Sequence, residues 1–126
     1  IIERLIPSSK LNLSKSVNLC IALLAFLLPS CSKQENIQLA EDLFAKGNYL
    51  EAANYYEMEL NASAGIDDST KAKLYLNAGL AHSKSNNDFL AIQCLQNAIN
   101  FSVNSPDLQS KSLNELGNIS YRKTND

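Results

Sequence analysis

The sequence is poor in the residue types on which enzymes rely. Its 126 residues include one histidine, His82, three cysteines and four glycines. His82 has no second histidine with which to share a metal ion, and the sequence offers no cysteine pair, no glycine-rich phosphate loop and no carboxylate pair around a plausible base. The adjacent Asp67 and Asp68 are interpreted as part of a helix cap rather than as a cation site. We therefore expect no enzymatic activity, no cofactor and no metal site, and a packing role for His82.

Long apolar runs are also scarce, and the main one lies near the start of the sequence. Residues 17–28 form a twelve-residue, mostly apolar segment, and Arg4, Lys10 and Lys15 precede it with only Glu3 opposing them. Such a charged segment followed by an apolar one is typical of a secretory signal. Twelve residues are too few to cross a bilayer, which takes about 20. An uncleaved signal or anchor and a buried core helix are the alternatives.

The apolar run is followed by Pro29, Ser30 and Cys31, and Leu28 to Cys31 resembles the bacterial lipobox. In that motif, a leucine three positions before the cysteine and a small residue directly before it admit the lipoprotein signal peptidase. The resemblance implies removal of residues 1–30, acylation of Cys31 and a tether over 31–33. The protein would then be lipid-anchored in a bacterial cell envelope, outside the cytoplasm. Ser32 is compatible with the outer membrane where two membranes exist.

Without the signal, 96 residues remain, which is enough for one small domain. These residues contain 8 Lys and Arg against 12 Asp and Glu, a net charge of −4. An acidic balance argues against nucleic-acid binding, which needs clustered cations. Because Cys31 would carry lipid, Cys94 has no partner for an intrachain disulfide. Its place in an apolar helical pattern favours a buried thiol over a redox or intermolecular one.

Residues 34–126 contain an internal repeat, carried by segments 46–56, 75–82, 86–99 and 114–121. These segments resemble the tetratricopeptide repeat (TPR), a helical hairpin with small and aromatic residues at fixed positions. Gly79 and Gly117 are 38 residues apart, and Ala52 and Ala91 are 39 apart, against 34 in the consensus repeat. The resemblance implies an all-α fold of antiparallel helical hairpins, stacked as a short right-handed α-solenoid. Its repeats would cover about 34–66, 68–104 and, in part, 106–123.

Caps and apolar periodicity predict five helices, at about 34–46, 49–62, 69–84, 88–102 and 106–123. The starts are marked by a capping box at 32–35, by Asp67 and Asn87, and by Ser105 before a proline. Glycine and alanine at 52, 79, 91 and 117 would let neighbouring helices approach closely. The predicted core is made of bulky residues: Leu43, Tyr49, Tyr56, Leu60, Tyr75, Phe89, Leu95 and Ile99. The last helix would bury a further side: Leu108, Leu113, Leu116 and Ile119.

The first helix of each TPR hairpin lines a concave groove, and alignment to the family predicts which residues face it. They are Gln34, Ile37, Glu41, Phe44, Lys73, Leu76, Asn77, Leu80, Lys84, Lys111, Asn114, Asn118 and Arg122. Some TPR domains clamp the C-terminal carboxylate of a partner with Lys, Asn and Arg side chains on this face. Only Asn77 and Lys111 match that set, so no such clamp is expected.

We therefore expect a membrane-anchored protein-interaction adaptor or assembly scaffold in the bacterial envelope, with a protein partner and no nucleic acid. Two alternatives remain open. The first is a regulatory subunit of a cell-wall enzyme. The second is a carrier of a small apolar ligand in the groove near Ile37, Phe44, Leu76 and Leu80.

Overall fold

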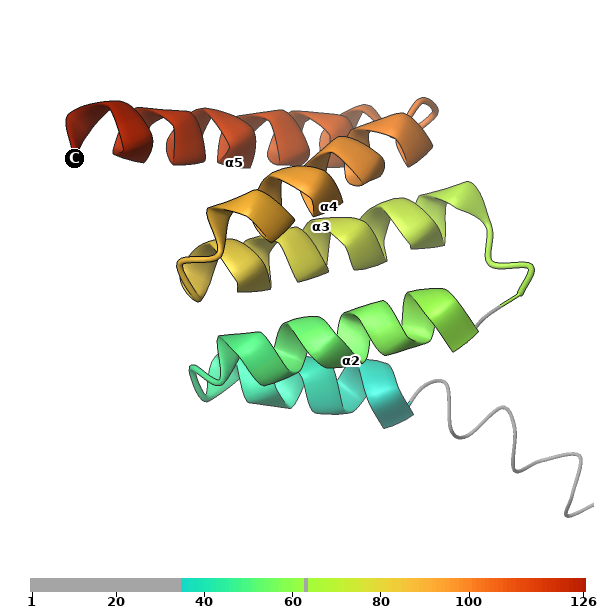
Figure 1. Ribbon diagram of the computed structural model, residues 1–126. Coiled ribbons are helices and arrows are strands. Elements are labelled where there is room, and N and C mark those ends of the chain that lie inside the picture. The colour runs from blue at the N-terminus through green and yellow to red at the C-terminus, as the bar shows by residue number, and fades with distance from the viewer. Residues whose placement is uncertain (1–34, 63) are drawn as a thin grey trace, which may run out of the picture. The chain divides into compact units, whose positions relative to one another are not determined.

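Helices account for most of the residues that the computed structural model describes, which are 35–62 and 64–126 (Figure 1). Within those ranges, a first helix at 35–45 is followed by α2 (Tyr49–Ala62), α3 (Asp68–Lys84), α4 (Asp88–Phe101) and α5 (Pro106–Asn125). The prediction of an all-α fold is confirmed. The ends of all these helices, and the starts of α2 to α5, lie within two residues of the predicted positions.

Several predictions concern residues outside the described ranges. They are the signal over 1–30, the lipidation of Cys31, the capping box at 32–35 and the groove residue Gln34. Residues 35–126 form one compact unit, and the description below concerns that unit.

The helix starts show which capping predictions hold. The Asp67 carboxylate accepts hydrogen bonds from the backbone N–H of Thr70 at 3.1 Å and from its hydroxyl at 2.6 Å, and these bonds lower the pKa of Asp67. Asn87 Oδ1 accepts from the backbone N–H of Leu90 at 3.4 Å. Ser105 occupies the N-cap position of α5, but its side chain makes no capping hydrogen bond. Pro106 at the first turn favours a helix start there without one, because its φ angle is already helical.

Each helix packs against the next one along the chain. Contacts join α2 to α3, α3 to α4 and α4 to α5, with a smaller contact between α3 and α5. One buried cluster draws on the 35–45 helix, α2 and α3, together with one residue of α4: Ala40, Ala52, Ala53, Tyr56, Leu74, Ala78, Ala81 and Cys94. A second cluster joins α3, α4 and α5: Leu76, Ala91, Leu95, Ala98 and Ile119. The alanines keep the helices close, and the few large residues fill the remaining space.

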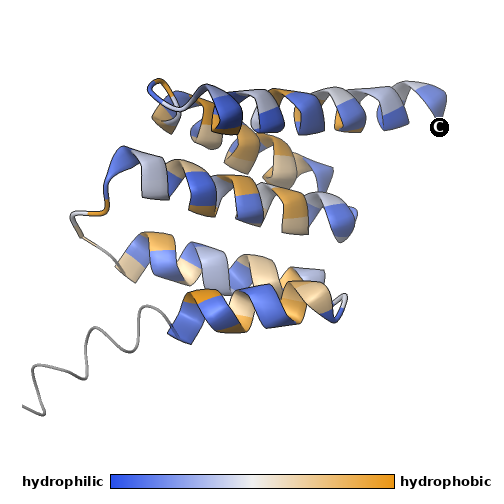
Figure 2. Ribbon diagram, turned by 180° about the vertical axis from the view of Figure 1, so that it is seen from behind, coloured by the Kyte–Doolittle hydropathy of each residue, from blue (hydrophilic) through white to orange (hydrophobic). Residues whose placement is uncertain are grey.

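Hydropathy differs sharply between the last two helices (Figure 2). Figure 2 shows α4 as mostly hydrophobic and α5 as mostly hydrophilic. α4 lies against both α3 and α5, whereas α5 buries only Ser112 and Ile119 fully. A helix with one apolar side can cover the end of a helical stack and leave its other side in water.

The two helical glycines differ in their surroundings. A Cβ atom added to Gly79 would lie 2.9 Å from Leu95 Cγ, so α4 approaches α3 where the glycine was predicted to permit it. A Cβ atom added to Gly117 would meet nothing within 4 Å. The predicted close approach at Gly117 is therefore wrong, because no helix of the described region covers that side of α5.

The two glycines should consequently respond oppositely to alanine. Gly79→Ala gains helix propensity of about 1 kcal/mol, but overpacking against a fully buried leucine costs roughly 1–3 kcal/mol. We expect a net loss of about 1 kcal/mol in the free energy of unfolding. Gly117→Ala pays no packing cost and should gain about 1 kcal/mol. Urea denaturation of both variants measures the two signs, and equal signs would contradict the difference in packing.

The predicted core is right in part. Tyr56 and Leu95 are buried, and the partly buried Leu43, Leu60 and Tyr75 pack on the first cluster. Tyr49 and Ile99 are also partly buried.

Phe89 and Leu113 are wrong predictions, because their side chains are 70% and 54% exposed. The buried residues of α4 are spaced by three and four from Ala91, and Phe89 lies off that stripe. Leu113 lies one position beyond the buried Ser112, on the open side of α5.

Candidate functional site

Three of the predicted groove residues come together around one small pocket. Phe44 from the 35–45 helix and Asn77 and Leu80 from α3 line it, together with Tyr56 from α2. The pocket has a volume of about 90 Å³. Asn77 and Leu80 are three residues apart, so they lie on the same side of α3.

The pocket walls are held by the core beneath them. The Phe44 ring meets the Tyr49 ring edge to face, with 5.0 Å between centroids, and Phe44 also packs on the first buried cluster. Leu80 packs on the second cluster. Because both side chains are anchored by these contacts, the apolar part of the pocket is largely pre-formed.

One wall is polar and lies near a negative charge. Burial, followed by the charge of Glu41, raises the pKa of Tyr56 above its ordinary value of 10.0. The phenol therefore stays neutral at physiological pH and can donate a hydrogen bond. Tyr56 was predicted only as a core residue, since its periodicity in α2 does not distinguish full burial from a place in a pocket wall.

The other predicted groove residues do not line this pocket. Leu76 is buried in the second cluster and is not among the residues that line this pocket. Ile37 packs on the first cluster. The remaining residues are exposed: Glu41, Lys73, Lys84, Lys111, Asn114, Asn118 and Arg122.

Several of these exposed side chains are engaged within the protein. Arg122 Nη2 donates to Ser83 Oγ at 3.0 Å and to Asp88 Oδ1 at 3.1 Å, which ties α5 to α3 and α4. Ser83 donates in turn to Glu115 Oε1 at 2.7 Å. On α5 itself, Lys111 pairs with Asp107 and Asn118 donates to Glu115, at 2.8 and 3.3 Å respectively. The hydrogen bonds of Arg122 within the protein account for this residue, so no partner protein is needed to explain it.

The single histidine has a polar environment that the sequence did not reveal. His82 is 1% exposed, and its Nε2 lies 2.8 Å from Glu57 Oε1. Cys94 Sγ donates to the same carboxylate oxygen at 3.9 Å. The predicted burial of Cys94 is confirmed, but its surroundings are not purely apolar. The three residues lie on α2, α3 and α4. His82 and Cys94 are 25 and 37 positions from Glu57, and no local pattern signals such a meeting.

This environment makes the Cys94 thiol less acidic than an ordinary cysteine. Burial, followed by the negative charge of Glu57 and its hydrogen bond, raises the pKa of Cys94 from 9.0 to about 11. The unfolded chain loses the thiol proton near pH 9 while the folded protein keeps it, so this residue's contribution to stability is complete below pH 9 and is lost as the pH rises toward 11.

Alkylation of Cys94 should report that shift. In a chain that carries Cys20→Ser and Cys31→Ser, we expect iodoacetamide to modify Cys94 very slowly at pH 8, because the thiolate is the reactive form. Glu57→Gln removes a negative charge and should move the midpoint of the rate profile to lower pH. Mass spectrometry of timed samples measures both profiles. Coinciding midpoints would show that the thiol does not sense this carboxylate.

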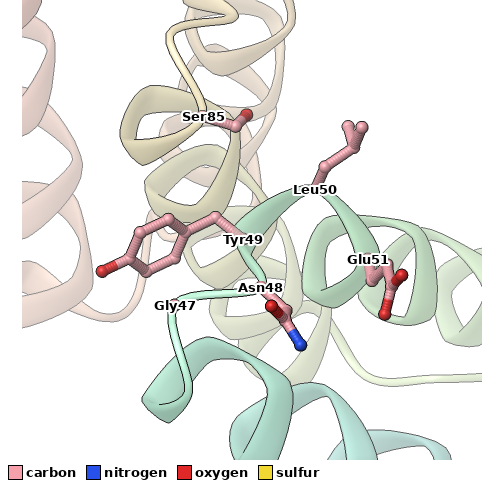
Figure 3. A pocket seen from close by; sticks show the side chains of 6 residues that line it. All are labelled: Gly47, Asn48, Tyr49, Leu50, Glu51 and Ser85. Carbon is pink, nitrogen blue, oxygen red and sulfur yellow. The ribbon is translucent and has the colours of Figure 1, made fainter.

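A further cleft lies at the ends of helices rather than between their faces (Figure 3). It has a volume of about 350 Å³ and is lined by Gly47, Asn48, Tyr49, Leu50, Glu51 and Ser85. These residues come from the turn before α2, the first turn of α2 and the residue after α3. Ser85 is already used, since its hydroxyl donates to the carbonyl of His82 at 2.9 Å. One carboxylate and no cation line this cleft, so it offers little to orient a charged ligand.

None of the helices in the described residues combines the length and apolar character needed to cross a bilayer.

Comparison with protein-family models, with curated proteins and with solved structures gives no match to this chain.

Proposed function

We propose that the protein is an adaptor or assembly scaffold that binds a segment of another protein at the Phe44–Tyr56–Asn77–Leu80 pocket. The pocket is the observation that carries this proposal. It combines two anchored apolar side chains with a phenol and an amide, which come from the 35–45 helix, α2 and α3. Such a surface can receive one side chain of a partner and hydrogen-bond to the polar groups beside it.

The volume of the pocket favours a peptide over a lipid or a nucleotide. At about 30 Å³ per water molecule, 90 Å³ corresponds to three waters or one aliphatic side chain. Pockets for small-molecule ligands usually exceed about 300 Å³. The alternative of a carrier for an apolar ligand is further disfavoured because Ile37 and Leu76, two of its four expected contacts, do not line the pocket.

We further propose that the helices form a TPR-like array of about two and a half repeats. Two observations support this arrangement: each helix packs on the next, and the small residues predicted at the helix contacts, Ala52, Gly79 and Ala91, are buried. Repeat arrays commonly present a continuous surface to extended partners, which suits an adaptor.

The proposed location is the bacterial envelope, with Cys31 acylated and the helical domain outside the cytoplasm. Intact mass of the membrane-extracted protein tests this part separately. A chain that begins at Cys31 with an added diacylglycerol, absent from Cys31→Ala, is expected. An unmodified full-length chain would remove the lipid anchor from the proposal without affecting the pocket.

Filling the pocket should abolish partner binding. Asn77→Phe adds a ring to a half-buried position without removing any apolar contact. Val103→Asp, in the exposed turn before α5, is the matched control. In cells, we expect the wild-type protein and Val103→Asp to crosslink to the same partner proteins, and Asn77→Phe not to crosslink to them. In calorimetry, the purified partners should bind the wild type and Val103→Asp but not Asn77→Phe. A partner that binds all three equally would place the binding surface elsewhere, and far-UV circular dichroism checks that each variant is folded.

The regulatory-subunit alternative uses the same surface and differs in its readout. If the partner is a cell-wall enzyme, adding the purified domain should change the turnover of that enzyme, and Asn77→Phe should not. An adaptor would bring partners together without changing their turnover.

A further inference from the structure

Three different metal-binding side chains meet between α2, α3 and α4. Glu57 Oε1, His82 Nε2 and Cys94 Sγ lie on three separate helices, and one ligand atom of each residue lies within 4.8 Å of the other two. Carboxylate oxygen, imidazole nitrogen and thiolate sulfur are the donor types that Zn²⁺ uses in proteins. The cluster is separate from the Phe44–Tyr56–Asn77–Leu80 pocket and shares no residue with it.

The spacing of the three atoms suits a shared ion. Ligands at about 2.0–2.3 Å from a tetrahedral Zn²⁺ lie roughly 3.3–3.8 Å from one another. Here the oxygen is 2.8 Å from the nitrogen and 3.9 Å from the sulfur. An ion could therefore enter with shifts of about 1 Å or less, mainly a separation of the carboxylate from the imidazole.

The site is closed on one side and accessible on the other. His82 and Cys94 are buried, whereas the Glu57 side chain is 38% exposed. Glu57 and Cys94 also line a pocket of about 230 Å³, whose polar lining includes Asn61, Gln93 and Asn97. An ion could enter through this pocket, and a water molecule could occupy the fourth coordination position.

The histidine has a polar atom that packing does not explain. His82 Nδ1 is fully buried and has no hydrogen-bond partner, although an unpaired buried polar atom costs free energy. Which nitrogen of the ring carries hydrogen depends on the tautomer. A metal ion is coordinated by an imidazole nitrogen that carries no hydrogen. An apolar side chain would fill the same space more cheaply, so burial alone does not account for a histidine here.

We propose that Glu57, His82 and Cys94 form a binding site for one Zn²⁺ ion, with water in the fourth position. On binding, the Cys94 thiol loses its proton to solvent as the sulfur–zinc bond forms. Coordination by Nε2 places the ring hydrogen of His82 on Nδ1, for which no described residue is an acceptor, so the unpaired Nδ1 atom is not itself a ligand of the ion. The bound ion joins α2 to α3 and α4, and thereby fastens the first hairpin to the second.

Zinc titration of the full-length chain tests the site. Cys20→Ser and Cys31→Ser are introduced first, because these thiols would also bind zinc. Competition with a chromophoric chelator should then give one Zn²⁺ per chain. Cys94→Ser and His82→Gln should each weaken binding by at least about 100-fold. Glu115→Gln, a partly buried carboxylate bound to Ser83, is the matched control and should bind as the parent does.

Two further measurements keep the test decisive if a variant folds poorly. Cobalt substitution of the parent chain should produce a thiolate-to-cobalt charge-transfer band. This band appears only if sulfur is a ligand, and its measurement does not depend on a ligand variant that folds. Zinc at 100 times its Kd should raise the Tm of the parent chain by roughly 10 °C, because the ion binds the folded state. The absence of stoichiometric binding, a cobalt complex without the sulfur band, or binding unaffected by Cys94→Ser would overturn the proposal.

Discussion

Leu95→Ala is expected to lower the free energy of unfolding by about 3–4 kcal/mol. Leu95 is fully buried in α4, in the cluster that joins α3, α4 and α5, and its side chain lies directly against Gly79. Truncation removes buried apolar atoms and leaves a cavity between backbones that the small residues already hold close together. Since small domains have only about 5–15 kcal/mol of stability, the loss should be visible as a large drop in Tm.

Phe89→Ala is the matched control for this prediction, since it removes an even larger apolar side chain from the same helix. Phe89 is 70% exposed, so the change should stay within about 0.5 kcal/mol. Urea denaturation followed by circular dichroism measures both variants. Similar losses for Leu95→Ala and Phe89→Ala would contradict the placement of α4 against α3.

Ile119→Ala is expected to release α5 from the rest of the domain. Ile119 is the only large residue of α5 that is fully buried, and Leu108 and Leu116 support it from partly buried positions. Its truncation should cost about 2–4 kcal/mol of local stability. The ion pair of Arg122 with Asp88 is partly exposed, and pairs of this kind contribute only about 0–1 kcal/mol, which is too little to compensate for that loss.

Hydrogen exchange distinguishes local release from global unfolding. In Ile119→Ala, amides of α5 should exchange much faster, while those of α2 and α3 around the first buried cluster should keep their protection. Leu113→Ala on the same helix is the control, because Leu113 is exposed and its loss should leave exchange unchanged. Uniform acceleration across all helices in Ile119→Ala would show that the described region unfolds as a single unit.

The two proposals depend on different residues of the protein. The adaptor proposal depends on the pocket between the 35–45 helix, α2 and α3, and the zinc proposal depends on the Glu57–His82–Cys94 cluster. Asn77→Phe leaves all three zinc ligands unchanged, and Cys94→Ser leaves the pocket walls unchanged. Failure of one proposal in these variants would therefore leave the other open to its own test.

The sequence alone determined where the helices begin and end. Asp67, Asn87 and Pro106 act within one turn of the helix that they start, and the apolar spacing of three and four is a property of a single helix. These signals are local, so they can be read without the fold. The same holds for the close approach at Gly79, because a glycine within a helix was predicted to let the neighbouring helix come near.

Tertiary structure decided everything that depends on how helices face one another. Gly117 repeats Gly79 in sequence but lies open, since covering it takes a further helix that the described residues do not include. Phe89 and Leu113 are apolar yet exposed, because the neighbouring helix covers only a stripe about a quarter to a third of the way around each helix. Glu57, His82 and Cys94 meet because α2, α3 and α4 pack side by side. His82 and Cys94 are 25 and 37 positions from Glu57, and such separations carry no sequence signal of contact.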